Sequence, residues 1–198
     1  MSTVKSKNLQ VGTDATASNN FTIYQPSTPD GTLRIGVGNA DSPTEVGQFN
    51  ANGYKPATAP AFAARLSTNQ SINTNTWTKM ALATETFDTN NNFDNVTNYR
   101  FTPTVAGYYY FTISGFASVG GSQRQLVSVY KNGSEAITGV NIGTTVGGGN
   151  CTITSGVLYA NGSTDYFEGW YYQDSGSTVT LVSATQLTWF DGHLVQQA

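Results

Sequence analysis

Charged side chains are scarce in this sequence of 198 residues, at 11%, with nine Lys and Arg against twelve Asp and Glu. Ordinary soluble domains carry about 25%. The solvated side of a helix is usually built from Glu, Lys, Arg and Gln, so long exposed helices are not expected. The basic residues form no cluster, and a nucleic-acid-binding surface is therefore not expected either.

Cysteine and histidine occur once each, as Cys151 and His193. A single cysteine cannot form an intrachain disulfide, and Cys151 is expected to pack as a small hydrophobic residue in a strand. His193 has no second His or neighbouring Cys to share a metal. The Gly147–Gly149 run lacks the Lys and Ser or Thr of a phosphate loop, and no Gly-x-Ser-x-Gly elbow occurs. We therefore expect no catalytic residue, no metal ligand and no cofactor, and hence no enzyme.

Two aspartates frame the loop Asp88–Asp94, a pattern that suggests calcium because hard cations bind clustered oxygens. The loop fails the EF-hand test, since Phe93 stands at position six in place of Gly and Tyr99 at position twelve in place of Glu. A polar loop is the better interpretation. No spacing pairs the other candidate carboxylates for acid–base chemistry: Glu85, Asp165 and Glu168.

The first ten residues include Lys5 and Lys7, but no apolar run follows them, and no window approaches the ~18 apolar residues of a membrane span. We therefore expect neither a secretory signal nor a membrane partner. The abundance of Asn, Thr, Tyr and Gly is nevertheless typical of extracellular β proteins. A virion component, made in the host cytoplasm and released by lysis, satisfies both observations.

Residues 1–59 contain three short alternating runs, Leu9–Gly12, Phe21–Tyr24 and Thr32–Val37. Pro29–Gly31 predicts a hairpin connection between the last two runs. Large apolar residues are few in this segment, so it is not expected to bury a core alone. It is expected to pack on another copy of itself or on a partner.

A denser pattern of strands begins after a predicted linker at Lys55–Pro60. The Asn132-Gly133 pair predicts a tight hairpin, because both residues tolerate the positive φ of a type I′ turn. Short strands at this spacing predict an all-β two-sheet sandwich or jelly roll. Ten strands are expected, near 61–67, 77–87, 97–102, 107–118, 124–131, 135–142, 151–160, 165–173, 178–188 and 189–195.

Four segments, in this order, resemble the C1q-like domain, a relative of the tumour necrosis factor fold. Pro60–Ala64 resembles the opening strand, and Tyr99–Phe111 resembles the central signature, an aromatic entry followed by a Phe-Thr-Pro step and Gly-x-Tyr-x-Phe. Val129–Gly133 resembles the Lys-Asn-Gly hairpin, and Phe190–Val195 the closing Phe-x-Gly-x-Leu strand. Where the family often has a Gly-Asp pair, Asn161–Asp165 predicts a longer turn. The family-signature core residues are Phe101, Gly107, Tyr109, Phe111, Phe190, Gly192 and Leu194.

The resemblance implies a ten-stranded C1q/TNF-like jelly roll that assembles as a compact homotrimer. Alternation along strand 107–113 separates two sets of side chains: Tyr109, Phe111 and Ile113 share one face, and Tyr108, Tyr110 and Thr112 share the other. The first set suits a core. Tyr108 and Tyr110 are candidate trimer-interface residues, with ordinary amphipathic surface residues as the alternative.

Residues 1–59 also resemble the β-rich N-termini of phage structural proteins. The prediction is a non-enzymatic phage virion surface protein, a homotrimeric capsid decoration (cement) protein. Residues 1–59 would anchor it to the major capsid protein or another virion protein, and residues 60–198 would form the projecting head. The alternative is a short tail fibre or baseplate appendage whose head binds a host-surface glycan through exposed aromatic residues. The candidates for that contact are Tyr166, Trp170, Tyr171 and Tyr172. A secreted non-viral C1q-like lectin is disfavoured by the missing signal and stalk.

Overall fold

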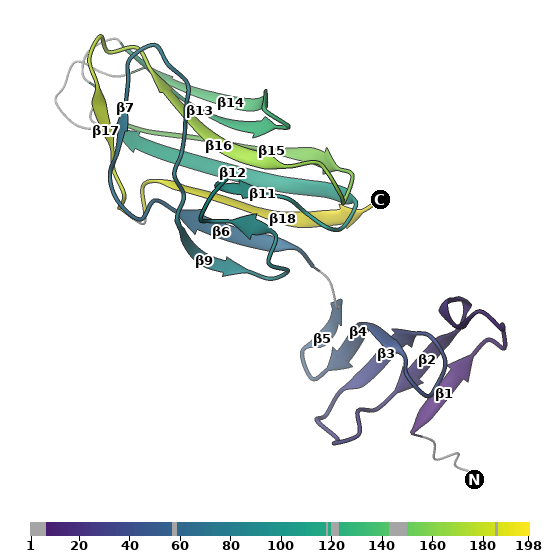
Figure 1. Ribbon diagram of the computed structural model, residues 1–198. Helices are drawn as coiled ribbons and strands as arrows, with labels where there is room; N and C mark the ends of the chain where they lie inside the picture. The colour runs from purple at the N-terminus through teal and green to yellow at the C-terminus, as the bar shows by residue number, and fades with distance from the viewer. Residues whose placement is uncertain (1–6, 57–58, 118, 120–122, 143–149, 185) are drawn as a thin grey trace. The chain divides into compact units, whose positions relative to one another are not determined.

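The chain folds as two units built from β-strands, Met1–Ala59 and Pro60–Ala198 (Figure 1). The computed structural model describes residues 7–56, 59–117, 119, 123–142, 150–184 and 186–198. Within these ranges the only helix is a single 3-10 turn, η1, at Ala17–Asn19. No described helix is long and apolar enough to cross a membrane.

The first unit is one antiparallel sheet whose strands follow chain order. The strands are β1 (Asn8–Val11), β2 (Phe21–Tyr24), β3 (Leu33–Val37), β4 (Thr44–Asn50) and β5 (Gly53–Pro56). The three predicted runs become β1 to β3, and β2 pairs with β3 as the predicted hairpin requires. The sequence analysis missed β4 and β5, and it was wrong to place Lys55 and Pro56 in the linker. Pro56 is tolerated there because β5 lies at the edge of the sheet.

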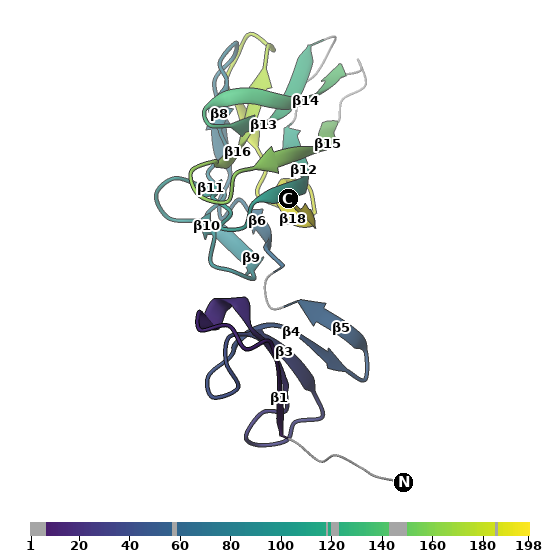
Figure 2. The same cartoon turned by 90° about the vertical axis from the view of Figure 1, so that its right-hand side faces the viewer.

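The second unit, which we call the head, contains two antiparallel sheets that pack face to face (Figure 2). In the β16 sheet the order is β10 (Phe93–Asp94), β11 (Arg100–Phe101), β16 (Phe167–Gln173), β13 (Arg124–Lys131) and β14 (Ser134–Ile142), with β8 (Thr78–Lys79) also paired to β16. In the β12 sheet the order is β7 (Gln70–Ile72), β17 (Val179–Leu181), β12 (Gly107–Ala117), β18 (Trp189–Gln197), β6 (Ala61–Arg65) and β9 (Thr84–Asp88), with β15 (Asn150–Ala160) also paired to β12.

The expected strand at 77–87 is divided in the structure between the two sheets. Its first part, β8, pairs with β16, and its last part, β9, pairs with β6. Met80 and Leu82, between them, are fully buried, so the apolar pattern belongs to a crossing between sheets and not to one strand. The expected strand at 178–188 shrinks to β17, and the sequence analysis missed β7 and β10.

Aromatic rings from both sheets fill the space between them. Phe62 stacks on Phe101 with ring centroids 4.4 Å apart, and Phe111 meets Phe167 at 4.4 Å. Gly192 allows this packing, because a Cβ there would lie 2.7 Å from the ring of Phe111. Of the family-signature residues, Phe101, Tyr109, Phe111 and Phe190 are fully buried, Gly107 and Gly192 are buried, and Leu194 is half-buried against the core.

Replacing Phe111 with alanine should lower the free energy of unfolding by about 3–5 kcal/mol, because it removes a fully buried ring at the centre of the aromatic cluster. Urea unfolding at fixed protein concentration measures the loss. The matched control is Val96→Ala, at a side chain that is 76% exposed, where a change within about 0.5 kcal/mol is expected. Similar losses at both positions would contradict the assignment of the core.

The predicted tight hairpin joins β13 and β14. Asn132 has φ 53° and Gly133 has φ 78°, as a type I′ turn requires. The Asn132 side chain also fixes the Asn161–Asp165 turn, since its Oδ1 accepts the Tyr166 N–H at 2.9 Å and its Nδ2 donates to Asp165 at 2.8 Å. These bonds tie together two turns that are about thirty residues apart in the chain.

Candidate functional site

The outer face of the β12 sheet carries large uncovered apolar side chains. Pairing between β12 and β15 sets Tyr108 opposite Tyr159 and Tyr110 opposite Val157. Tyr108 and Tyr159 meet edge to face at 5.6 Å. The exposed fractions are 50% for Tyr108, 42% for Tyr159, 51% for Val157 and 60% for Ile153. This surface, which we call the outer β12 face, thus includes both tyrosines that the sequence analysis named for an interface.

Polar residues continue the outer β12 face onto β18 and β6. Arg65 forms an ion pair with Asp191, and the His193 ring lies 5.6 Å from that of Tyr110. No group of three or more His, Cys, Asp or Glu within the described residues could hold a metal ion. His193 lies within a surface that combines aromatic and polar side chains, a composition common at protein interfaces.

A second aromatic set lies on the outer side of the β16 sheet. Trp170 and Tyr130 stack with centroids 4.7 Å apart. Trp77 completes the set by contacting Tyr130 at 5.7 Å and Tyr172 at 5.5 Å. The sequence analysis identified Trp170 and Tyr172 but missed Trp77 and Tyr130, because only the pairing of β8, β13 and β16 brings these residues together.

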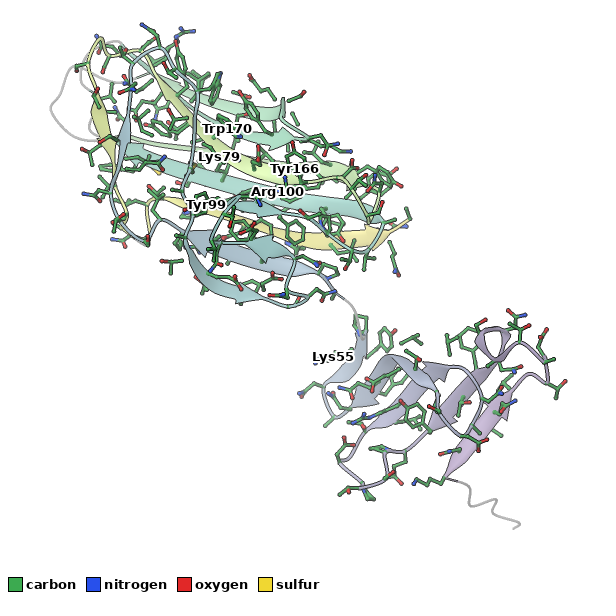
Figure 3. All side chains as sticks on the ribbon, viewed as in Figure 1. Lys55, Lys79, Tyr99, Arg100, Tyr166 and Trp170 are labelled. Carbon is green, nitrogen blue, oxygen red and sulfur yellow. The ribbon has the colours of Figure 1, made fainter. Side chains whose placement is uncertain are left out.

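Other side chains already cover these rings. Lys79 and Tyr130 approach Trp170 from strands on opposite sides of β16, with the Lys79 Nζ 5.9 Å from the ring centroid (Figure 3). The guanidinium of Arg100 lies 4.4 Å from the ring of Tyr166. Sugars bind aromatic residues through an open ring face. Tyr130 and Lys79 lie against the Trp170 ring, and Arg100 occupies one face of the Tyr166 ring.

Tyr171 is a correction to the predicted set of glycan-facing residues. Its side chain is fully buried, and its hydroxyl donates to the Oε1 of Gln125 in the interior. Burial raises the pKa of the Tyr171 hydroxyl well above its usual value. Side chains alternate along β16, so Tyr171 points inward where Trp170 and Tyr172 point outward.

The aspartates of the loop Asp88–Asp94 bind their own backbone. Asp88 accepts the N–H groups of Asn90 and Phe93. Asp94 accepts those of Val96, Thr97 and Asn98, and these bonds lower its pKa to about 2. Carboxylate oxygens used in this way shape a polar loop.

Chelation should leave the melting temperature nearly unchanged. The Asp88 and Asp94 oxygens already accept backbone hydrogen bonds, so a bound cation would have to displace them. Thermal melts with and without EDTA provide the measurement. A fall of more than about 10 °C would correspond to a few kcal/mol of linked metal binding and would contradict this assignment.

Two of the remaining candidate carboxylates form ion pairs. Glu168, which is buried, pairs with Lys79 at 2.7 Å and accepts the Trp170 indole N–H at 3.1 Å. Asp165 pairs with Lys131 at 2.9 Å. Desolvation raises the pKa of Glu85, with a smaller contribution from Asp88. Glu168 and Asp165 therefore stabilise the fold through their ion pairs.

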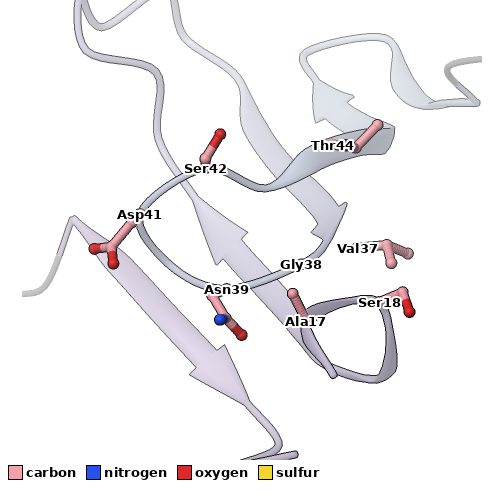
Figure 4. Close-up of a pocket in the computed structure, with 8 residues that line it drawn as sticks. All are labelled: Ala17, Ser18, Val37, Gly38, Asn39, Asp41, Ser42 and Thr44. Carbon is pink, nitrogen blue, oxygen red and sulfur yellow. The ribbon is translucent and has the colours of Figure 1, made fainter. Parts of the chain in front are cut away.

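The first unit has a shallow pocket between η1 and the β3–β4 connection (Figure 4). Its lining residues are mostly small: Ala17, Ser18, Val37, Gly38, Asn39, Asp41, Ser42 and Thr44. Asp41 is the one ionisable side chain among them. No set of converging donors or acceptors distinguishes this pocket as a ligand site.

Comparison with known proteins gives matches to solved structures, whereas no family model and no curated protein matches the sequence. Eiger TNF from S. frugiperda covers 73% of this chain and 96% of its own, with a TM-score of 0.53 and 6% identity. The head is a TNF-like jelly roll. Murine APRIL aligns with this chain at a TM-score of 0.53 and 10% identity, covering 70% of this chain and all of its own.

The TNF-like jelly roll confirms the predicted fold class. PRD1 vertex protein P5 is also similar, at a TM-score of 0.46 and 14% identity over 70% of this chain and 96% of its own. At these identities the comparisons establish the fold. The surfaces of the TNF-like head and of the first unit therefore provide the basis for a functional proposal.

Proposed function

We propose that this protein is a non-enzymatic, homotrimeric virion surface protein, a capsid decoration protein anchored by residues 1–59. The observation that carries the proposal is the outer β12 face, where apolar and tyrosine side chains are 42–60% exposed on a TNF-like jelly roll. Monomeric proteins rarely leave such side chains contiguous and uncovered.

Self-association suits the composition of the outer β12 face. Interface centres are enriched in Tyr and poor in charge, and the β12–β15 part of this face presents Tyr108, Tyr110, Val157 and Tyr159 without a charged residue among them. The charged residues Arg65 and Asp191 pair with each other at the β6–β18 side. A TNF-like head of this kind supports a homotrimer held by apolar and tyrosine contacts, with no disulfide.

The structures of the two units support different roles, with trimerisation in the head and anchoring in the first unit. The head has a closed core whose members all lie between Phe62 and Phe190, so it needs no shell in order to fold. The first unit is a single sheet with two edge strands, β1 and β5. Unpaired strand edges are surfaces that another chain completes. The first unit is therefore the better candidate for the virion contact.

The alternative is a tail fibre or baseplate appendage with a glycan-binding head. The aromatic set on the outer side of the β16 sheet favours it, because Tyr172, Trp77 and Tyr130 are partly exposed together. The covered ring faces of Trp170 and Tyr166 weaken it. Capsid decoration therefore remains the primary proposal.

Copy number distinguishes the two roles. Decoration requires hundreds of copies per particle, whereas a fibre or baseplate appendage requires a handful. Quantifying this protein against the major capsid protein in purified particles gives the ratio directly. A ratio of only a few copies per particle would replace decoration with the appendage role.

A further inference from the structure

One side of the sheet in the first unit is a continuous apolar surface, which we call the apolar face. Strand pairing places Leu9 beside Ile23 and Ile23 beside Ile35, and a neighbouring row places Leu33 beside Phe49 and Phe49 beside Tyr54. The side chains of this face that are 44–58% exposed are Leu9, Val11, Phe21, Leu33, Phe49 and Tyr54.

The opposite side of the same sheet is polar, and its arginine is already paired. Arg34 pairs there with Asp30 at 2.6 Å and with Glu45 at 3.0 Å. Asn20, fully buried beside the end of this sheet, donates to Asp14 and Asn39. The first unit is thus a single layer with a finished polar side, and within its described residues no second layer covers the apolar face.

The exposed apolar area is large for so small a unit. The three aromatic side chains among these six present on the order of 300 Å² together, taking half of the ~150–250 Å² that an aromatic side chain buries, and the three aliphatic ones bring the total to roughly 500 Å². The largest apolar patch on a whole typical monomer is about 300–600 Å², and a stable interface buries about 800 Å² on each partner. The apolar face therefore offers more than half of the area that one side of a stable interface buries.

We infer that the apolar face packs against the same face of the other two copies in the trimer, so that three sheets enclose a shared core. This inference rests on the proposed homotrimer. Only Ala57, Thr58 and Ala59 separate Pro56, the end of β5, from Pro60 of the head, and such a tether spans roughly 15 Å at most. Three heads in contact would therefore hold three apolar faces at high effective concentration.

The chemistry of the face also fits a copy of itself. No charged residue lies on it within β1–β5, whereas Arg34, Glu45 and Lys55 all lie on the opposite side. The charged Lys7, just before β1, lies at the margin of this face, where it lines a depression with Leu9 and Leu33. Identical contacts repeated about a three-fold axis would close the three copies into a ring. The polar side and the edges of β1 and β5 then remain available to the virion.

Crosslinking of the full chain tests the inference. In a Cys151→Ser background, Leu33→Cys puts a thiol on the apolar face, and Gln48→Cys puts a matched thiol on the polar side, opposite Arg34. Light scattering first gives the oligomeric state, and a short bis-maleimide then links thiols that lie close together. We expect a trimer in which Leu33→Cys chains shift to covalent dimers on a denaturing gel and Gln48→Cys chains do not.

Each other outcome overturns the inference in a distinguishable way. A trimer whose Leu33→Cys chains stay unlinked would mean that the apolar face is covered by something else, such as a virion protein, while the head trimer stands. Equal linking at both positions would mean that the copies do not meet specifically through the apolar face. A monomer before crosslinking would overturn this inference and the proposed trimer together. Circular dichroism confirms that both variants keep their β structure.

Discussion

The head alone, residues 60–198, should be a monomer in solution at micromolar concentration when aspartate replaces Val157. Val157 lies in β15 opposite Tyr110, on the outer β12 face, and is 51% exposed. In a trimer built on this face, each copy would bury an unpaired carboxylate, at a cost of several kcal/mol per ion. Each 1.4 kcal/mol weakens association about tenfold. Light scattering on residues 60–198 under reducing conditions measures the change, because this chain lacks the apolar face of the first unit.

The matched control carries the same substitution at another exposed valine. Val96, 76% exposed, follows β10 at the far end of the β16 sheet, and Val96→Asp should leave the trimer intact. Circular dichroism should show native β structure in both variants, because neither side chain belongs to the core. A Val157→Asp protein that remains a trimer would show that the outer β12 face is not the interface.

Removing residues 1–59 should abolish binding to particles while the head still folds and trimerises. The head has its own aromatic core, whereas the first unit offers the edges of β1 and β5 and little internal core. Binding of the full chain should depend only weakly on salt. Arg34 is already paired with Asp30 and Glu45, which leaves few basic side chains free to neutralise an acidic partner.

Particles that lack this protein provide the assay. They are mixed with the full chain or with residues 60–198, separated by sedimentation, and the bound protein is quantified. The full chain serves as the positive control, and light scattering verifies that the shortened chain is still a trimer. If residues 60–198 decorate particles as well as the full chain does, the anchoring role of the first unit is wrong.

Local patterns in the sequence were enough to predict the kind of fold. The alternation of β12 separates buried Tyr109 and Phe111 from exposed Tyr108, because side chains of a strand point to opposite faces whatever lies around it. The hairpin at Asn132-Gly133 follows from backbone freedom at two residues. Both features depend on neighbours along the chain, which the sequence displays directly.

The aromatic residues in and just before β16 show what local sequence patterns do not predict. Tyr166, Trp170, Tyr171 and Tyr172 look alike as a run of aromatic residues, yet Tyr171 is buried and the rings of Trp170 and Tyr166 are covered by Lys79 and Arg100. Those partners come from β8 and the start of β11, far away in sequence. Only strand pairing decides which ring faces remain open.

In the first unit, too, some features follow from local sequence and others follow only from strand pairing. Its short runs and its Pro29–Gly31 turn predicted strands with few large apolar residues, and these became β1 to β3. The sequence did not reveal that β4 and β5 extend the sheet, or that Leu33, Phe49 and Tyr54 line up in one row. Register across strands is a non-local property, since it is set by which backbone groups pair. Only the tertiary structure therefore shows that hydrophobic residues scattered along the sequence form one exposed apolar face.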